Sequence, residues 1–279
     1  MEHRTARVNG IRLHYVADGE GPPVILLHGW PQTWYAWRKL LPVLARRYTV
    51  IAPDLRGYGD SDKPAAGYDK RTMAADIHEL VRALGYSRVR LVGHDRGARV
   101  AHRYALDFED EVERLVLLDI IPTRIVFERV DKDVALASWH WFFHMVPDLP
   151  ELLVGANVEG YLRYFFRAWA YQTAAFTPED IAVYVHAFSQ SGALRAGFED
   201  YRAGGTTDLA HDRADATRKI KAPILVLWGS EGRLEASGIL DVWRGVADDV
   251  QGEGIPACGH FLPEEQPQVV AAKLLHFLG

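Results

Sequence analysis

The chain has 279 residues, of which 48% are hydrophobic and 25% are charged, and its formal net charge is −5. This composition is typical of globular proteins, and it excludes a disordered chain, a collagen and a disulfide-stapled miniprotein. A general nucleic-acid-binding protein would carry a basic excess, which is absent here. The single cysteine, Cys258, cannot form an intramolecular disulfide, and no apolar run reaches the roughly 18 residues that span a bilayer. The first residues also lack the apolar core of a signal peptide, so we expect a cytoplasmic protein that binds neither nucleic acid nor membrane.

The first half of the chain alternates short strands with helices. Asn9-Gly10 lies between two β-prone runs and predicts a two-residue hairpin. Short apolar runs predict buried strands at residues 24–27, 49–52, 89–92 and 115–118. Helices are predicted at residues 34–47 and 72–84, and after the glycine-rich turn at 93–97 as far as about residue 107. Such alternation with short links predicts a parallel sheet with helices on both faces.

The alternation stops at Asp119 and resumes at Pro223. The intervening residues show no strand-helix rhythm and contain about half of the aromatic residues of the chain. A strand is predicted at 223–227, another before Cys258, and a closing apolar helix at 269–278. We therefore predict one α/β domain formed by residues 1–119 and 211–279, with a helical cap inserted at residues 120–210.

The segment Gly93-His94-Asp95-Arg96-Gly97 follows a predicted buried strand and opens a predicted helix. It matches the G-x-nucleophile-x-G elbow of hydrolases, with aspartate where serine is usual. Glycines on both sides let the backbone turn tightly and expose the central side chain. The alternative interpretation is that Asp95 merely caps the following helix.

Three further signals follow the chain order of a hydrolase with a nucleophile, an acid and a histidine. His28-Gly29 ends an earlier strand, so the backbone amides of Trp30 and Arg96 are candidates for an oxyanion hole. His260, which lies between the last strand and the last helix, is the candidate base. Asp119, at a strand end, is the candidate acid. Glu231, in the loop after the next strand, is its rival, and we interpret it as a solvated charge.

An aspartate nucleophile changes the expected chemistry. A carboxylate can displace a leaving group from saturated carbon, which leaves an alkyl ester on Asp95. It needs no base, because the ordinary pKa of aspartate is about 3.9 and the group is ionised at pH 7. His260 is needed only later, to activate water against the ester, while Asp119 fixes its tautomer.

Two arginines occupy the first turn of the helix that Asp95 opens. Arg96 and Arg99 are three residues apart, so they lie on one face of that helix. The helix dipole disfavours cations at this end, which suggests that an anion binds between them and the nucleophile. A small carboxylate suits a bidentate arginine. The alternative is ordinary ion pairing with Asp or Glu.

These motifs resemble the α/β-hydrolase superfamily, in the branch with an aspartate nucleophile that includes haloalkane dehalogenases, epoxide hydrolases and fluoroacetate dehalogenases. The first two groups usually carry tryptophan directly after the nucleophile, where this chain has Arg96. The segments at 93–99, 118–123, 139–141, 199–204 and 259–261 together resemble the fluoroacetate (haloacetate) dehalogenase family. The similarity runs from about residue 5 to the C-terminus.

The resemblance implies further roles. It implies that Arg96 and Arg99 bind the substrate carboxylate, and that three hydrogen-bond donors hold the departing halide, namely His140, Trp141 and Tyr201. It implies an enzyme without cofactor or metal and a homodimer. Trp169 is loosely similar to a pocket-gating tryptophan of the family and is left outside this set. Residues 124–127 depart from the polar-aromatic pattern expected there, which bears on the size of the pocket.

The sequence therefore predicts a hydrolase that converts 2-haloacetates, such as fluoroacetate and chloroacetate, to glycolate and halide. The alternative is an epoxide hydrolase with the same nucleophile, which would need two cap tyrosines to protonate the epoxide oxygen. The available tyrosines are Tyr161, Tyr164, Tyr171 and Tyr184. A third possibility is a ligand-binding relative without turnover, but the intact set of Asp95, Asp119 and His260 argues against it.

Overall fold

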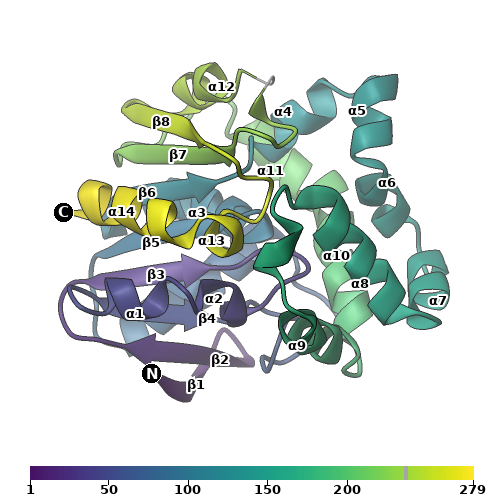
Figure 1. The fold of residues 1–279 in the computed structure, drawn as a ribbon. Coiled ribbons are helices and arrows are strands. Elements are labelled where there is room, and N and C mark those ends of the chain that lie inside the picture. Colours follow the sequence, from purple (N-terminus) through teal and green to yellow (C-terminus); the bar gives the residue numbers. More distant parts are fainter. Residues whose placement is uncertain (236–237) are drawn as a thin grey trace.

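A central eight-stranded sheet organises the molecule (Figure 1), as the computed structural model of residues 1–235 and 238–279 shows. Its strands lie in the order β1-β2-β4-β3-β5-β6-β7-β8. β1 pairs with β2 and β2 with β4 in antiparallel fashion, and all other pairs are parallel. The predicted fold class is thereby confirmed. The strand bounds are β1 (Glu2–Val8), β2 (Ile11–Asp18), β3 (Pro23–Leu27), β4 (Thr49–Pro53), β5 (Val89–His94), β6 (Val112–Leu118), β7 (Ile224–Gly229) and β8 (Val250–Ile255).

The predicted hairpin joins β1 to β2. Val8 lies opposite Ile11, so the loop has two residues. Both loop residues have positive φ, 44° at Asn9 and 77° at Gly10. This is the conformation that a type I′ turn requires, and Asn-Gly adopts it at little cost.

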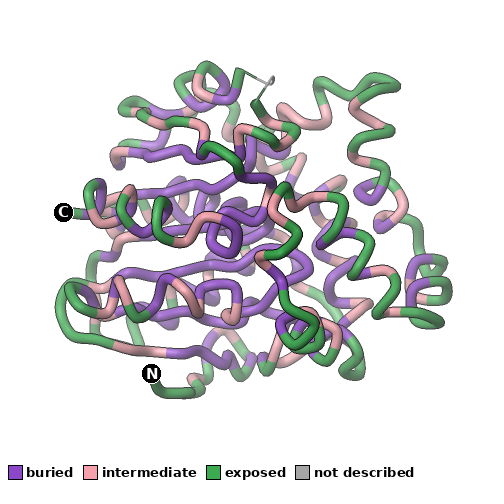
Figure 2. The backbone as a smooth tube through the Cα atoms, viewed as in Figure 1, coloured by how far each residue is buried: buried purple, intermediate pink, exposed green. Residues whose placement is uncertain are grey.

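Helices cover both faces of the sheet, and the interior strands are buried on both sides (Figure 2). Along β3, Ile25 and Leu27 join one hydrophobic cluster while Val24 and Leu26 join the other, because successive side chains point to opposite faces. The first cluster includes side chains of α2 (Lys70–Ala83), α3 (Arg96–Asp107) and α12 (Ile239–Val246). The second includes those of α1 (Leu41–Leu44) and α14 (Pro267–Leu278).

The single helix predicted at residues 34–47 is wrong. The structure has a 3₁₀ turn, η1 (Trp34–Trp37), followed by the one-turn helix α1. Pro42 explains the break, because it has no N–H to donate to the carbonyl of Arg38 and its ring clashes with that carbonyl. A proline is tolerated only near the start of a helix, and α1 accordingly restarts at Leu41.

The segment between β6 and β7 is helical and lies over the carboxyl ends of the parallel strands (Figure 1). The cap helices run from Thr123 to Ala214, compared with the predicted cap at residues 120–210. Within residues 1–235 and 238–279, no helix has the length and apolarity needed to cross a membrane. The cap helices are α4 (Thr123–Glu128), α5 (Lys132–Ala137), α6 (Trp139–Met145), α7 (Leu149–Gly155), α8 (Val158–Trp169), α9 (Pro178–Phe188), α10 (Ala193–Gly205) and α11 (Thr207–Ala214). Two short 3₁₀ turns, η2 (Glu109–Glu111) and η3 (Thr173–Ala175), and the helix α13 (Leu262–Glu265) complete the described elements.

Candidate active site

Asp95 occupies a strained turn between β5 and α3. Its φ is 47°, a conformation that residues other than glycine rarely adopt. Only glycine fits on either side: a Cβ on Gly93 would lie 2.5 Å from the Cα of Ala98, and one on Gly97 2.3 Å from the carbonyl oxygen of His28. The sequence thus holds the carboxylate of Asp95 at the carboxyl edge of the sheet, in the geometry of a nucleophile elbow.

The structure brings Asp119 and His260 together behind Asp95. The Nδ1 of His260 lies 2.5 Å from Oδ2 of Asp119, whose Oδ1 accepts a hydrogen bond from the amide of Gly229 at 3.2 Å. The Nε2 of His260 lies 3.8 Å from Oδ2 of Asp95 and has no hydrogen-bond partner among the described residues. If Nδ1 carries the proton toward Asp119, Nε2 is left as an acceptor aimed at the nucleophile. Glu231, the rival acid, is exposed.

The electrostatics suit an ionised nucleophile beside a basic histidine. Burial disfavours the charge of Asp95, but His260 and the neighbouring cations outweigh it and lower the pKa of this carboxyl. Burial likewise disfavours a charged His260, but the hydrogen bond and charge of Asp119 raise its pKa above the ordinary value of 6.5. Asp95 is therefore a carboxylate at neutral pH, and His260 is a stronger base than a histidine in water.

A pH profile should reveal this base. Because only neutral His260 can accept a proton from water, turnover limited by ester hydrolysis should rise with pH through a midpoint above 6.5. Replacing Asp119 with asparagine should move the midpoint down, since the partner that raises the pKa is weakened. The measurement is kcat from pH 5 to 9 for both proteins. A wild-type midpoint below 6.5 would contradict the arrangement.

Backbone donors surround the carboxylate of Asp95. The amide of Trp30 donates to Oδ1 of Asp95 at 2.9 Å, and the amide of Arg96 is the first of helix α3. Two histidines brace the turns around them. Nε2 of His28 accepts from the amide of Leu55 at 3.0 Å, and Nε2 of His94 lies 2.7 Å from the carbonyl oxygen of His260.

Arg99 is a buried cation at the wall of a cavity that also contains Asp95 and His260. Its Nη1 donates to the carbonyl oxygen of Ile121 at 3.0 Å and to Oγ1 of Thr123 at 2.8 Å. Its Nε has no partner, and no carboxylate of the described residues lies within 4.0 Å of this guanidinium. Burial lowers the pKa of Arg99 to about 10, which still leaves it cationic at neutral pH.

Arg96 lies deeper and is held by Asp200 of the cap helix α10. Its Nε donates to Oδ1 of Asp200 at 2.9 Å, and its Nη2 donates to the carbonyl oxygen of Asp200 at 2.6 Å. Asp200 also pairs with Lys70 and accepts from the hydroxyl of Tyr58 at 2.8 Å. Only Nη1 of Arg96 lacks a partner among the residues that the structure covers. Arg96 therefore joins the nucleophile elbow to the cap, while Arg99 lines the cavity.

Removing Asp200 should destabilise the protein strongly. In an Asp200→Ala variant, Arg96 and Lys70 would remain buried without their carboxylate, which costs about 3–5 kcal/mol in comparable cases. Urea unfolding should show this loss in the free energy of unfolding. Asp241→Ala, which breaks an exposed pair with Arg244, is the control and should cost less than about 1 kcal/mol. Equal effects of the two substitutions would refute the role of Asp200 as a tether.

The three predicted halide donors gather on two cap helices. His140 and Trp141, on α6, line the cavity, and Tyr201, on α10, is buried beside them with its ring centroid 5.8 Å from His140 and 5.9 Å from Trp141. Burial lowers the pKa of His140 well below its ordinary value and raises that of Tyr201 well above. Both are therefore neutral groups with a proton to donate. Trp141 also covers the arginines, with its ring centroid 4.6 Å from Cζ of Arg99 and 5.5 Å from Cζ of Arg96.

The cavity has a volume of about 390 Å³ and lies between the cap and the carboxyl edge of the sheet. Glu231 lines it as well, and so do residues that the sequence did not single out, among them Arg233 in the loop after β7. Cζ of Arg233 lies 5.6 Å from the ring centroid of Trp169, which also lines the cavity. The position of Arg233 could have been predicted from the sequence, because the loops that follow parallel strands face the ligand site in open α/β sheets.

The family described as "alpha/beta hydrolase fold" matches residues 22–267. The chain belongs to the α/β-hydrolase fold family. A soluble epoxide hydrolase from Corynebacterium sp. is 46% identical over 99% of this chain and 97% of its own length. A fluoroacetate dehalogenase from Burkholderia sp. is 40% identical over 100% of this chain and 94% of its own length. A solved structure of the epoxide hydrolase CorEH has 45% identity and a TM-score of 0.95, and the match covers 99% of this chain and 98% of the other.

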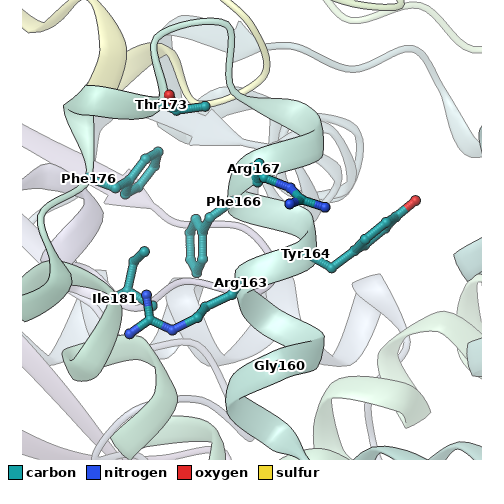
Figure 3. Close-up of a pocket in the computed structure, with 8 residues that line it drawn as sticks. All are labelled: Gly160, Arg163, Tyr164, Phe166, Arg167, Thr173, Phe176 and Ile181. Carbon is teal, nitrogen blue, oxygen red and sulfur yellow. The ribbon is translucent and has the colours of Figure 1, made fainter.

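A second hollow of this α/β hydrolase, of about 540 Å³, lies on the cap between α8 and α9 (Figure 3). Phe166 and Phe176 form its floor, with ring centroids 4.8 Å apart, and Arg163, Tyr164 and Arg167 stand along α8. None of its lining residues belongs to the set around Asp95. The larger hollow is therefore not the active site.

Proposed function

We propose that this α/β hydrolase converts 2-haloacetates, including fluoroacetate and chloroacetate, to glycolate and halide. The observation that carries this proposal is Arg99, a buried guanidinium beside the nucleophile with no carboxylate partner in the described part of the chain. A buried unpaired cation is costly unless an anion reaches it. A carboxylate substrate supplies that anion and places its α-carbon near Asp95.

In the proposed first step, an oxygen of Asp95 attacks the α-carbon. The carbon–halogen bond breaks, and its electron pair leaves with the halide. His140, Trp141 and Tyr201 donate hydrogen bonds to the halide, while Arg99, with Nη1 of Arg96 as a second donor, holds the carboxylate. The product of this step is an alkyl ester of Asp95.

In the second step, Nε2 of His260 takes a proton from water, and the resulting hydroxide attacks the carbonyl carbon of the Asp95 ester. The amides of Trp30 and Arg96 stabilise the tetrahedral oxyanion. The bond between that carbon and the alkyl oxygen then breaks, and the glycolate alkoxide takes the proton from His260. Asp119 stabilises the imidazolium between these transfers. No step requires a cofactor or a metal.

An epoxide hydrolase is the second candidate, and the 46% identity to a soluble epoxide hydrolase favours it. The four tyrosines considered for it are poorly suited. The hydroxyl of Tyr161 lies 2.6 Å from Nε2 of His144, that of Tyr184 lies 2.6 Å from Glu264, and Tyr164 and Tyr171 are exposed. In an epoxide hydrolase, the groups that would protonate the epoxide oxygen are instead Tyr201 and His140, the same groups that would bind a halide.

The two functions separate in one experiment. Purified protein is offered fluoroacetate, chloroacetate and styrene oxide in parallel, and halide and diol are measured. The proposal expects halide release from both acids. Diol formation without halide release would assign the enzyme to the epoxide hydrolases and overturn the proposal.

Trp141→Phe should impair defluorination more than dechlorination. Fluoride is small and strongly hydrated, so its departure depends more on each compact hydrogen bond than that of chloride. Loss of a hydrogen bond to a charged group costs about 1.5–3 kcal/mol, or roughly ten- to a hundredfold in rate. We expect a loss of that order in kcat/KM for fluoroacetate and a smaller one for chloroacetate. Equal fractional losses would remove Trp141 from the halide site.

The likeness to the dehalogenase family also underlies the proposal of a cytoplasmic homodimer. Sedimentation equilibrium of the purified protein tests the dimer, and a monomer at micromolar concentration would refute it.

A further inference from the structure

The cavity at Asp95 has a charged end and an apolar wall. Asp95, Arg99, Asp119 and His260 form the charged end. The apolar wall is formed by side chains from the end of β6, the cap helices α4, α5 and α8, and the loop after β7, namely Ile120, Ile121, Val126, Val134, Ala137, Ala168 and Leu234. The rest of the lining is mainly polar, aromatic or charged, and it includes Arg129, Glu231 and Arg233. The two parts meet at Ile121, whose carbonyl oxygen accepts from Nη1 of Arg99 while the residue lines the cavity.

A haloacetate would leave most of this space unfilled. At about 30 Å³ for each water-sized group, its few non-hydrogen atoms occupy roughly 150 Å³ at most. The cavity measures about 390 Å³, within the range of sites that enclose much larger ligands. Val126 and Val134 are only half-buried, so they offer apolar surface that a ligand could cover. Val126 belongs to the segment 124–127 that departs from the dehalogenase pattern.

We infer that the preferred substrate is a 2-haloalkanoate with an apolar chain on its α-carbon, which packs against Ile121, Val126 and Val134. This inference rests on the proposed function and specifies its substrate class. The carboxylate pairs with Arg99, the halogen faces the donors of α6 and α10, and the chain extends from the α-carbon along the wall. Nucleophilic attack, halide departure and ester hydrolysis are unchanged.

The test compares 2-chloropropionate, 2-chlorobutyrate and 2-chlorohexanoate. The reacting carbon is secondary in all three, so their intrinsic reactivity is similar and only the chain differs. Burial of one methylene is worth about 0.8 kcal/mol, so kcat/KM should rise about fourfold for each added methylene. A flat or falling series would overturn the inference.

Two variants of helix α5 test whether the apolar wall contacts the alkyl chain of the substrate. Val134→Phe fills the apolar end and should lower the ratio of kcat/KM for 2-chlorohexanoate to that for 2-chloropropionate by about tenfold or more. Leu136→Phe, on the same helix but 66% exposed and outside the cavity, is the matched control and should leave the ratio unchanged. An unchanged ratio in Val134→Phe would refute the assigned wall.

The result also separates this inference from the proposed function. Halide release from chloroacetate, but from none of the longer acids, would refute the apolar-chain substrate and leave the dehalogenase proposal standing. No halide release from any acid, chloroacetate included, would refute the proposed function itself.

Discussion

A His260→Asn variant should form the alkyl ester on Asp95 and then stop. The first step needs only an ionised carboxylate, and the nearby Arg96 and Arg99 still favour the charged form of Asp95 when His260 is absent. The second step loses the base that activates water, which contributes about 10²–10⁴-fold in comparable enzymes. Turnover should fall by that factor, while the release of one halide per protein molecule persists.

Mass spectrometry of the intact variant after exposure to chloroacetate should show one carboxymethyl group, and peptide mapping should place it on Asp95. A double variant that also carries Asp95→Asn is the control and should remain unmodified. An adduct on another residue, or full turnover by His260→Asn, would refute the two-step scheme.

Arg99→Leu should nearly abolish turnover of haloacetates. Truncating one partner of a buried charge pair costs about 2–5 kcal/mol, which corresponds to a loss of about 30- to several-thousandfold in kcat/KM. Arg99→Lys keeps the charge but not the planar fork, so it should recover part of the loss. Kinetics of halide release from chloroacetate measure both variants.

A neutral alkyl halide such as 1-chlorobutane is the control substrate for Arg99→Leu. It has no carboxylate to lose, so its slow reaction should change far less than that of chloroacetate. Equal losses on both substrates would mean that Arg99 supports the fold of the site rather than the binding of an anion. Unchanged kinetics with chloroacetate would refute the anion site altogether.

The sequence predicted that Asp95, Asp119 and His260 lie close together, and the structure brings them together, because their positions depend on local rules. Asp95 and Asp119 each follow a short buried strand and His260 follows β8, and parallel strands bring their carboxyl ends to one edge of the sheet. Gly93 and Gly97 indicate a tight turn around Asp95, because a side chain at either position would clash with backbone atoms. The same local reasoning failed at residues 34–47, where the apolar spacing was helical but Pro42 outweighed it.

The relation of Arg96 to Asp200 could not be read from the sequence. The two residues lie 104 positions apart, and their contact depends on how the cap folds back onto α3. From the sequence both arginines were predicted to have the same role, whereas in the structure Arg96 pairs with a buried carboxylate and Arg99 has none within reach among the described residues. The size of the cavity was equally out of reach, because it depends on cap helices whose packing no local pattern specifies.

Single turnover in ¹⁸O-labelled water distinguishes attack by Asp95 from direct attack by water on the substrate. Chloroacetate is mixed with an excess of the protein, so that each protein molecule turns over at most once. The glycolate and the peptide containing Asp95 are then analysed by mass spectrometry. If Asp95 forms an ester that water attacks at its carbonyl carbon, the hydroxyl oxygen of the first glycolate comes from Asp95. We therefore expect unlabelled glycolate and one labelled oxygen on Asp95. Label in the first glycolate with none on Asp95 would mean that water displaces the halide directly and would refute an ester of Asp95.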